Sequence, residues 1–368
     1  MHILNVVGAR PNLMKIAPLV EEIQCYPDIR QTLLHTGQHY DAKMSQVFFD
    51  ELAIPRPDIY LGIGSGSHAE QTARVMVAFE QVLLERRPDV VVVVGDVNST
   101  LACAVTAAKL WIPVAHVEAG LRSFDRKMPE EINRIVTDAL ADFLFTTSRG
   151  AGVNLQREGV PAEKIFFVGN VMIDTLMKHR TRAVALGTPA KFGLQPDNYA
   201  LLTLHRPSNV DIPEVLAGIL NALATIQQEI PILFPAHPRT VKRIKEFGFQ
   251  EGLTGCPNLH LVEPLGYLEF LDLMAHARLM VTDSGGIQEE TTILGVPCLT
   301  LRENTERPVT VTEGTNLVIG SDPDRIRKEI QHILLGCTLP NRTPELWDGQ
   351  STERIVSILH QHFSEQDK

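Results

Sequence analysis

Three carboxylates stand where predicted strands give way to loops or helices. Asp96 follows the apolar run Val90–Val94, Glu118 follows Pro113–Val117, and Glu130 lies in the first turn of the next predicted helix. The carboxyl ends of parallel strands meet at one edge of a sheet, so we expect the three acids to lie close together. Like charges held close shift each other's pKa, which is typical of functional sites, although each acid taken alone also fits a turn or a helix cap.

Two cations lie at the start of the first predicted helix. Pro11 is placed to open this helix, and Arg10 and Lys15 fall within its first turn and a half. A helix N-terminus offers free N–H groups and a positive dipole end, so the segment predicts a diphosphate site; a solvated helix start is the alternative. The segment is neither a GxGxxG motif nor a Walker loop, and it therefore predicts neither NAD nor ATP.

Basic residues follow two successive apolar runs in the second half of the chain. His205 and Arg206 follow the first of these runs, and His237 and Arg239 follow the second. Either histidine alone fits a structural role, but two basic pairs in an acidic protein predict a surface for a negatively charged ligand.

A strand, a Ser-Gly-Gly turn and a helix are predicted around Asp283, with Ser284, Gly285 and Gly286 forming the turn. Free N–H groups at this turn would face a phosphate. One helical turn further on, Glu290 could accept both hydroxyls of a ribose, and Arg307 adds a cation after the next strand. The alternative is a generic Gly-Gly turn.

Short apolar runs rich in Val, Ile and Phe alternate with predicted helices along the chain, which is typical of parallel β-α-β units. The predicted strands of the first half are Ile3–Val7, Thr32–His35, Val90–Val94, Pro113–Val117, Phe143–Thr146 and Ile165–Val168. Those of the second half are Ala200–Leu204, Ile232–Phe234, Leu259–Val262, Leu279–Thr282, Cys298–Leu301 and Leu317–Ile319. The sequence thus predicts an α/β protein with two Rossmann-like doubly wound domains, and we expect the function to sit in a central cleft that both domains face.

The predicted domain boundary lies near residues 169–185, where the strand ending at Val168 is followed by an amphipathic stretch and then by the polar, Gly- and Pro-containing Arg180–Asn198. We expect an N-terminal Rossmann-like domain carrying the acids over residues 1–170 and a C-terminal Rossmann-like domain carrying the Ser-Gly-Gly turn over residues 171–350. Residues 351–368 are predicted to form a helix that packs back on the N-terminal domain.

Composition excludes several classes of protein. The 368 residues carry a net charge of −10, which argues against nucleic acid as a partner because phosphate binding needs clustered Lys and Arg. The five cysteines show no CxxC spacing, so neither a disulfide framework nor a zinc site is expected. No apolar run approaches the ~20 residues that span a membrane, and we expect a cytoplasmic protein with no membrane partner.

The order of these motifs resembles the non-hydrolysing UDP-N-acetylglucosamine 2-epimerases over nearly the whole chain. The resemblance rests on Gly8–Pro11, Gly95-Asp96, His116–Arg122, Pro129–Glu131, Asp283–Gly286 and Thr305–Pro308. It implies a glycosyltransferase-B-like fold, a homodimer and a UDP-sugar substrate. It also implies that Asp96, Glu118, Glu130 and His205 line the reacting sugar. The residues implied around UDP are Arg10, Lys15, Arg134, His237, Arg239, Ser284, Gly285, Gly286, Glu290 and Arg307.

The implied chemistry needs no cofactor and no metal. Departure of UDP from C1 develops positive charge beside C2 and lets a carboxylate abstract the C2 proton, so elimination gives UDP and 2-acetamidoglucal. Re-addition with protonation from the opposite face then inverts C2. The roles of the three acids are assigned jointly, since spacing does not separate base from acid.

Other activities of the same fold stay open at the sequence level. A hydrolysing 2-epimerase, a glycosyltransferase and a non-enzymatic nucleotide-sugar sensor would share the nucleotide site. The substrate is also open, because segment 62–72 and the run after His205 differ from the housekeeping pattern, and relatives with such variants include enzymes for diacetamido-uronic acid sugars.

Many bacterial relatives need substrate at a second, adjacent site. Here Gln38 and His39 match that site, but Asp41 replaces a Gln, and segment 64–69 lacks an expected Arg. Asp41 would repel phosphates and the missing Arg removes a partner for them, so the sequence predicts hyperbolic kinetics without substrate activation.

Overall fold

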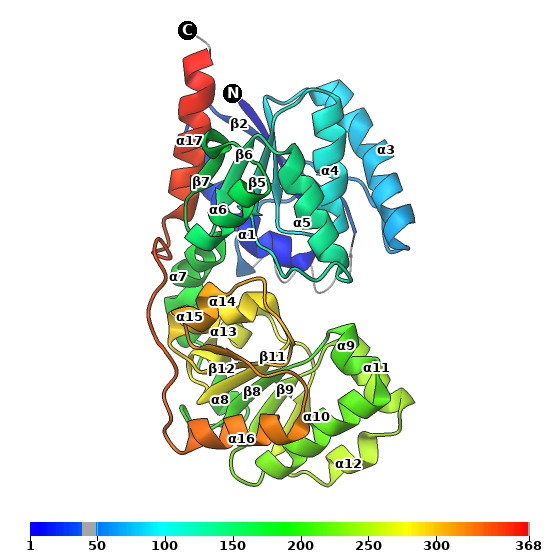
Figure 1. Cartoon of the computed structure of the whole chain (residues 1–368), viewed down its shortest axis with the longest axis vertical. Coiled ribbons are helices and arrows are strands. Elements are labelled where there is room, and N and C mark those ends of the chain that lie inside the picture. The colour runs from blue at the N-terminus through cyan, green and yellow to red at the C-terminus, as the bar shows by residue number, and fades with distance from the viewer. Residues whose placement is uncertain (39–48, 50, 367–368) are drawn as a thin grey trace. The chain divides into compact units, whose positions relative to one another are not determined.

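The computed structural model describes residues 1–38, 49 and 51–366, and it divides into two compact units. Unit 1 comprises Met1–Lys178 and Glu345–Lys368, and unit 2 comprises His179–Pro344 (Figure 1). The second-site residues His39 and Asp41 lie outside the described residues, and so does the side chain of Arg10.

Unit 1 is built on a seven-stranded parallel sheet in the order β3-β2-β1-β4-β5-β6-β7. Its strands are β1 (His2–Val7), β2 (Arg30–His35), β3 (Ile59–Tyr60), β4 (Val90–Val94), β5 (Val114–Ala119), β6 (Phe143–Thr146) and β7 (Ile165–Phe167). The strand order reverses between β1 and β4. Ligands of doubly wound sheets bind at the carboxyl ends of the strands beside such a switch point.

Helices cover both faces of this sheet. They are α1 (Arg10–Ile23), α3 (His68–Arg86), α4 (Asn98–Lys109), α5 (Pro129–Leu140), α6 (Arg149–Arg157), α7 (Val171–Val184) and α17 (Ser351–Gln366), with a short 3-10 turn at Ala162–Lys164. Helices α3, α4 and α5 lie side by side, whereas α1 packs with α17 (Figure 1). Buried Ala102, Ala104 and Ala107 let α4 approach the sheet closely, because they present no bulky side chain.

Unit 2 repeats the architecture with a six-stranded parallel sheet in the order β10-β9-β8-β11-β12-β13. Its strands are β8 (Ala200–Thr203), β9 (Ile232–Pro235), β10 (Leu259–Val262), β11 (Leu279–Thr282), β12 (Cys298–Thr300) and β13 (Asn316–Val318). Its helices are α8 (Thr188–Lys191), α9 (Pro207–Val210), α10 (Pro213–Ile226), α11 (Pro238–Glu246), α12 (Gln250–Thr254), α13 (Tyr267–Ala275), α14 (Gly285–Leu294), α15 (Val309–Thr312) and α16 (Pro323–Leu334). The switch point lies between β8 and β11.

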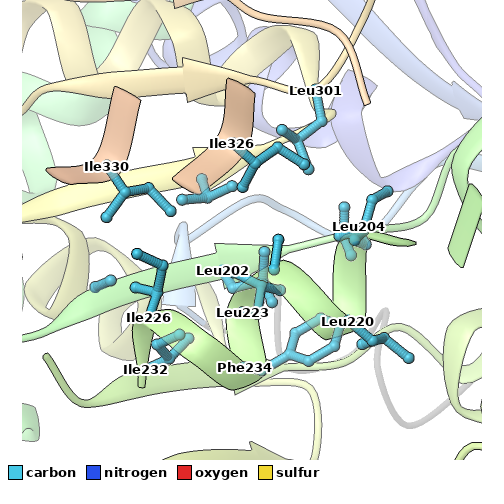
Figure 2. Packing of buried hydrophobic residues seen from close by; sticks show 14 of the residues in the cluster. Leu202, Leu204, Leu220, Leu223, Ile226, Ile232, Phe234, Leu301, Ile326 and Ile330 are labelled. Carbon is cyan, nitrogen blue, oxygen red and sulfur yellow. The ribbon is translucent and has the colours of Figure 1, made fainter. Parts of the chain in front are cut away.

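The core of unit 2 forms between one face of the sheet and two helices. Leu202 on β8 and Phe234 on β9 pack with Leu223 on α10 and with Ile326 and Ile330 on α16 (Figure 2). These side chains are fully buried, so this core fixes the strands whose ends carry the polar motifs.

The predicted α/β class with two Rossmann-like sheets is confirmed. Strand β3 was not predicted, because two residues at a sheet edge carry too little apolar pattern to be recognised. Strand β5 runs on through Glu118 to Ala119, whereas the sequence predicts its end at Val117. Within the described part of the chain, no helix has the length and apolar character to cross a membrane.

Candidate active site

A tight turn after β4 carries the first predicted acid. Gly95 adopts φ +67, a left-handed conformation that glycine tolerates best, and Asp96 follows it. A Cβ on Gly95 would lie 2.9 Å from Lys15 Nζ and 3.4 Å from Glu118 Oε2. The structure thus brings the Asp96 turn, Glu118 and Lys15 together beside the switch point of the sheet.

Glu118 is held in an unusual backbone conformation. The pairing of β5 with β6 shifts register between Val117 and Ala119, so Glu118 is the extra residue of a bulge, with φ +77. Non-glycine residues rarely adopt such angles, and bulges and strained residues cluster at functional sites, where they re-aim a side chain. The Glu118 carboxylate forms a buried ion pair with Lys15, so Lys15 lies in the acid cluster.

The Asp96 side chain is anchored by a buried arginine. Arg134 on α5 forms an ion pair with Asp96, and its Nε and Nη2 donate to Glu131 at 3.0 and 2.6 Å. Glu130 stands four residues before Arg134 on α5, a spacing that suits a helical ion pair, but Arg134 pairs with Glu131 and with Asp96 from another element. Arg134 therefore orients the first acid, while Asn133 donates to the Asp96 carbonyl at 2.8 Å.

Glu131 links Arg134 to the loop that follows β5. Its carboxylate also accepts from the amides of Ser123 and Phe124 at 3.0 and 2.8 Å. Burial opposes ionisation, but the amides and Arg134 together hold the pKa of Glu131 below its ordinary value. Because its folded-state pKa is lowered, Glu131 contributes stability at neutral pH, and this stability is lost as the pH falls through the folded-state pKa.

We expect Glu131→Gln to destabilise unit 1 by about 3 kcal/mol, because it leaves the Arg134 charge buried without its main partner. Both tryptophans, exposed Trp111 and buried Trp347, lie in unit 1, so tryptophan fluorescence during urea unfolding reports this unit. Glu130→Gln is the matched control, since Glu130 is only half-buried. Equal stability of the two variants would contradict the anchoring role of Glu131.

Asp96 and Glu130 line the same cavity at this edge of unit 1. It has a volume of about 250 Å³, and its walls are Gln38, Ser65, Gly66, His68, Gln71, Asp96, Val97, Asn98, Pro129, Glu130 and Asn133. Glu118 is not part of this wall but lies beside Gly95, the residue before Asp96.

Several wall residues escaped the sequence analysis. The amide of Asn98 donates to Gln71 at 2.9 Å, and Gln71 donates to the carbonyls of Gln38 and Gly64 at 3.1 and 2.9 Å. The spacing of Asn133, three residues after Glu130 on α5, was the one available signal. The sequence analysis named Gln38 only for the second site, and Gln71 only as part of segment 62–72. Because the two come from distant segments, their meeting in this wall could not be predicted.

In unit 2, a buried aspartate organises the switch point. Asp283, at the end of β11, accepts from the amides of His205 and Arg206 at 3.0 and 2.9 Å and pairs with His205 Nδ1 at 2.9 Å. Burial opposes ionisation, but these bonds hold the pKa of Asp283 below its ordinary value. Asp283 therefore fixes His205, whose side chain is 42% exposed.

The Ser-Gly-Gly turn begins α14 as predicted. Ser284 is the residue before this helix, and the amides of Gly285 and Gly286 lie in its first turn. A Cβ on Gly285 would come within 2.6 Å of Arg307 Nη1, so glycine here lets a guanidinium approach the helix N-terminus. Free amides and a cation thus coincide, which is an anion-binding arrangement. Arg307 is also paired with Glu306 and, at 2.8 Å, with Glu289.

Glu290 lies one turn into α14 and is buried. Burial, with the charge of Glu289 adding to it, raises the pKa of Glu290 to about 8, although the Tyr267 hydroxyl donates to it at 3.0 Å and opposes the rise. Glu290 therefore holds its proton at neutral pH unless a ligand supplies further donors.

His237 and Arg239, the second predicted basic pair, contact different residues. His237 is the residue before α11, its Nδ1 accepts from the Arg239 amide at 3.2 Å, and its ring lies 6.1 Å from that of His205. The Arg239 guanidinium forms an ion pair with Asp211. His205 and His237 therefore lie at the same edge of the sheet, while Arg239 binds Asp211, the residue directly after α9.

Two parallel Rossmann-like sheets, one with the predicted acids and one with the N-terminus of α14 at its switch point, define a glycosyltransferase-B-like α/β protein. The profile of the UDP-N-acetylglucosamine 2-epimerase family matches residues 21–360, and the chain belongs to this family. It is 45% identical to a UDP-N-acetylglucosamine 2-epimerase of Methanocaldococcus jannaschii over 98% of this chain and 99% of the relative.

Two further comparisons bear on substrate and fold. A UDP-2,3-diacetamido-2,3-dideoxy-D-glucuronate 2-epimerase of Pseudomonas aeruginosa is 41% identical, over 98% of this chain and 99% of that relative. The crystal structure of the M. jannaschii UDP-GlcNAc 2-epimerase in complex with UDP-GlcNAc and UDP superposes with a TM-score of 0.91 at 45% identity, covering 98% of this chain and 100% of that one. The chain is therefore an epimerase of this fold.

Proposed function

We propose that this chain interconverts UDP-N-acetylglucosamine and UDP-N-acetylmannosamine without hydrolysing them. The observation that carries the proposal is the placement of Asp96 and Glu130 on one cavity wall, with Glu118 beside the Asp96 turn. Inversion at C2 needs a base on one face of the sugar and an acid on the other, and several carboxylates at one site supply both.

In the proposed reaction, one carboxylate takes the C2 proton while the C1–O bond to UDP breaks and a C1=C2 double bond forms. A second acid then protonates C2 from the opposite face as a UDP oxygen adds back to C1. Cations near the departing diphosphate lower the barrier, because they stabilise the charge that develops on it. We assign Asp96, Glu118 and Glu130 jointly to the proton transfers and His205 to the sugar.

We propose that unit 2 holds the nucleotide. The hydroxyl of Ser284 and the amides of Gly285 and Gly286, with Arg307 beside them, would bind the diphosphate, and Glu290 would accept the ribose hydroxyls. The Ser284 amide itself donates to Thr282 Oγ1 at 3.0 Å. His237 and Arg239 lie at the same sheet edge, and Arg10, Lys15 and Arg134 complete the proposed set. Of these, Lys15 and Arg134 already pair with acids of unit 1, which supports a role for both in orienting the acids.

The P. aeruginosa relative makes a diacetamido-uronic acid sugar a second candidate substrate. Against it, no Lys or Arg is among the described residues that line the cavity, whereas Asp96 and Glu130 are. A uronic carboxylate there would meet the like charges of Asp96 and Glu130. We therefore propose a neutral N-acetylhexosamine.

The proposal includes a cytoplasmic homodimer. All five cysteines are free, which supports a reducing compartment. Val77 and Leu84 on α3 are 67% and 62% exposed, and a second copy could cover them. Light scattering on the purified chain tests the oligomeric state.

Incubation with UDP-N-acetylglucosamine alone, followed by proton NMR, tests the function. We expect a mixture of the two UDP-sugars, with no metal or nicotinamide added. Free N-acetylmannosamine plus UDP would instead indicate a hydrolysing epimerase. No reaction until an acceptor sugar is added would indicate a transferase.

A further inference from the structure

A buried histidine contacts the turn that carries Asp96. His116 on β5 is fully buried, and both ring nitrogens have partners. Its Nε2 lies 2.8 Å from the carbonyl oxygen of Gly95, and its Nδ1 lies 2.6 Å from Asp138 Oδ1. A carbonyl oxygen only accepts hydrogen bonds, so Nε2 carries a hydrogen and donates it to Gly95.

Asp138 is held in the ionised form by its surroundings. Its Oδ2 accepts from the Gly120 amide at 3.1 Å and pairs with Arg122 at 2.7 Å. Burial opposes ionisation, but the neighbouring charges of His116 and Arg122 hold the pKa of Asp138 below its ordinary value. Nδ1 of His116 faces this carboxylate, so a hydrogen lies between Nδ1 and Asp138 Oδ1.

The histidine therefore belongs to a row of paired polar side chains. Arg122 also donates from Nε and Nη2 to Glu158 at 2.8 and 2.6 Å, so the row runs from His116 through Asp138 and Arg122 to Glu158. His116, Asp138 and Arg122 are buried, whereas Glu158 is exposed, so the row leads from the core to the surface. The row fixes the orientation of the imidazole ring.

This row reaches the ends of two strands that carry proposed catalytic acids. His116 holds the carbonyl of Gly95, the residue before Asp96. Asp138 holds the amide of Gly120, which stands two residues after Glu118. Gly95 and Gly120 both have positive φ, and these conformations need support if the turns are to keep one geometry.

We infer that His116 is a positioning residue for C2 epimerisation, which sets the Gly95–Asp96 peptide, and so the Asp96 carboxylate, through its Nε2–H···O=C bond to Gly95. The inference rests on the proposed function of Asp96. His116 itself contacts no substrate in this account; it is buried behind the turn.

Two substitutions separate its two hydrogen bonds. The amide of Gln reaches the position of Nε2, so His116→Gln can keep the bond to Gly95 and loses the bond to Asp138. The amide of Asn reaches the position of Nδ1, so His116→Asn keeps Asp138 and loses Gly95. Each variant gives up one buried bond, and a purely structural role predicts similar effects of both.

We expect His116→Asn to lower kcat about 100-fold, the loss typical of a catalytic group displaced by ~1 Å, and His116→Gln to lower it less than tenfold. The KM for the UDP-sugar and the Kd for UDP should stay within about twofold in both, because the acid geometry, and not ligand binding, is altered. Equal kcat values, the reverse order, or a parallel loss of UDP affinity would overturn the inference.

Hydrogen–deuterium exchange of segment 94–98 gives a readout that does not depend on activity. Exchange should rise in His116→Asn and stay near the wild-type value in His116→Gln; equal exchange in the two variants would overturn the inference. If wild type fails to epimerise, the proposed function fails, while the exchange data still decide on His116. If the Asn variant does not fold, a 100-fold loss of kcat in His116→Gln is enough to contradict the inference.

Discussion

Asp96→Asn is expected to lower kcat about 1,000-fold, in the range typical for loss of a general acid or base. The amide is nearly the same size as the carboxylate and keeps an oxygen for Arg134, but it neither takes nor returns the C2 proton. Asp96 side-chain exposure is 28%, and it lines the cavity, so the substitution leaves no fully buried gap. UDP affinity should change less than about twofold, because we place the nucleotide on unit 2.

Asp142→Asn is the matched control for Asp96. Asp142 belongs to unit 1 and lies just before β6, at the opposite, amino end of the strands, where it pairs with Lys164 at 3.0 Å. Its kcat should equal that of wild type. Steady-state kinetics and UDP calorimetry on both variants provide the comparison; a loss of UDP affinity in Asp96→Asn as large as its loss of kcat would show that Asp96 binds the nucleotide.

Glu290→Gln is expected to weaken UDP binding about 10- to 100-fold, the typical value of hydrogen bonds to a charged acceptor. The same substitution should stabilise the free protein at high pH. Burial raises the pKa of Glu290 to about 8 in the folded state, above its ordinary value of 4.5, so the folded state binds the extra proton and stability falls as pH rises between these values. Glutamine keeps an acceptor for Tyr267 and removes this dependence.

Glu289→Gln is the matched control, because Glu289 neighbours Glu290 on α14 but pairs with Arg307 at 2.8 Å. Removing its charge leaves Arg307 short of a partner and should destabilise the protein. Calorimetric unfolding between pH 6 and 9 is the measurement, since both tryptophans lie in unit 1 and do not report on unit 2. A Glu290→Gln variant that melts below wild type at pH 9 would contradict a buried, proton-holding Glu290.

The strands other than β3 could be predicted because most are apolar runs, which is the typical sequence of a strand covered on both faces. Val90–Val94 is the plainest case, and its predicted bounds match β4. Strand ends in a parallel sheet share one edge, so the nearness of Asp96 to Glu118 followed from their positions after such runs.

The bulge at Glu118 and the partners of the charged residues could not be predicted. The bulge arises from how β5 pairs with β6, and the sequence of β5 alone does not encode the register of its neighbour. For Arg134, helical spacing suggests only partners three or four positions away, whereas Asp96 comes from another element. Likewise, His116 meets Asp138 from α5, and no short motif joins them.

Turnover of UDP-N-acetylglucosamine in heavy water tests the central claim most directly. Elimination through a 2-acetamidoglucal places the C2 proton on a carboxylate, where it can exchange with solvent. We therefore expect NMR to show deuterium at C2 of both UDP-N-acetylmannosamine and recovered UDP-N-acetylglucosamine. Epimerised product that keeps its original C2 hydrogen would contradict the proton-transfer mechanism and with it the assignment of the acid cluster.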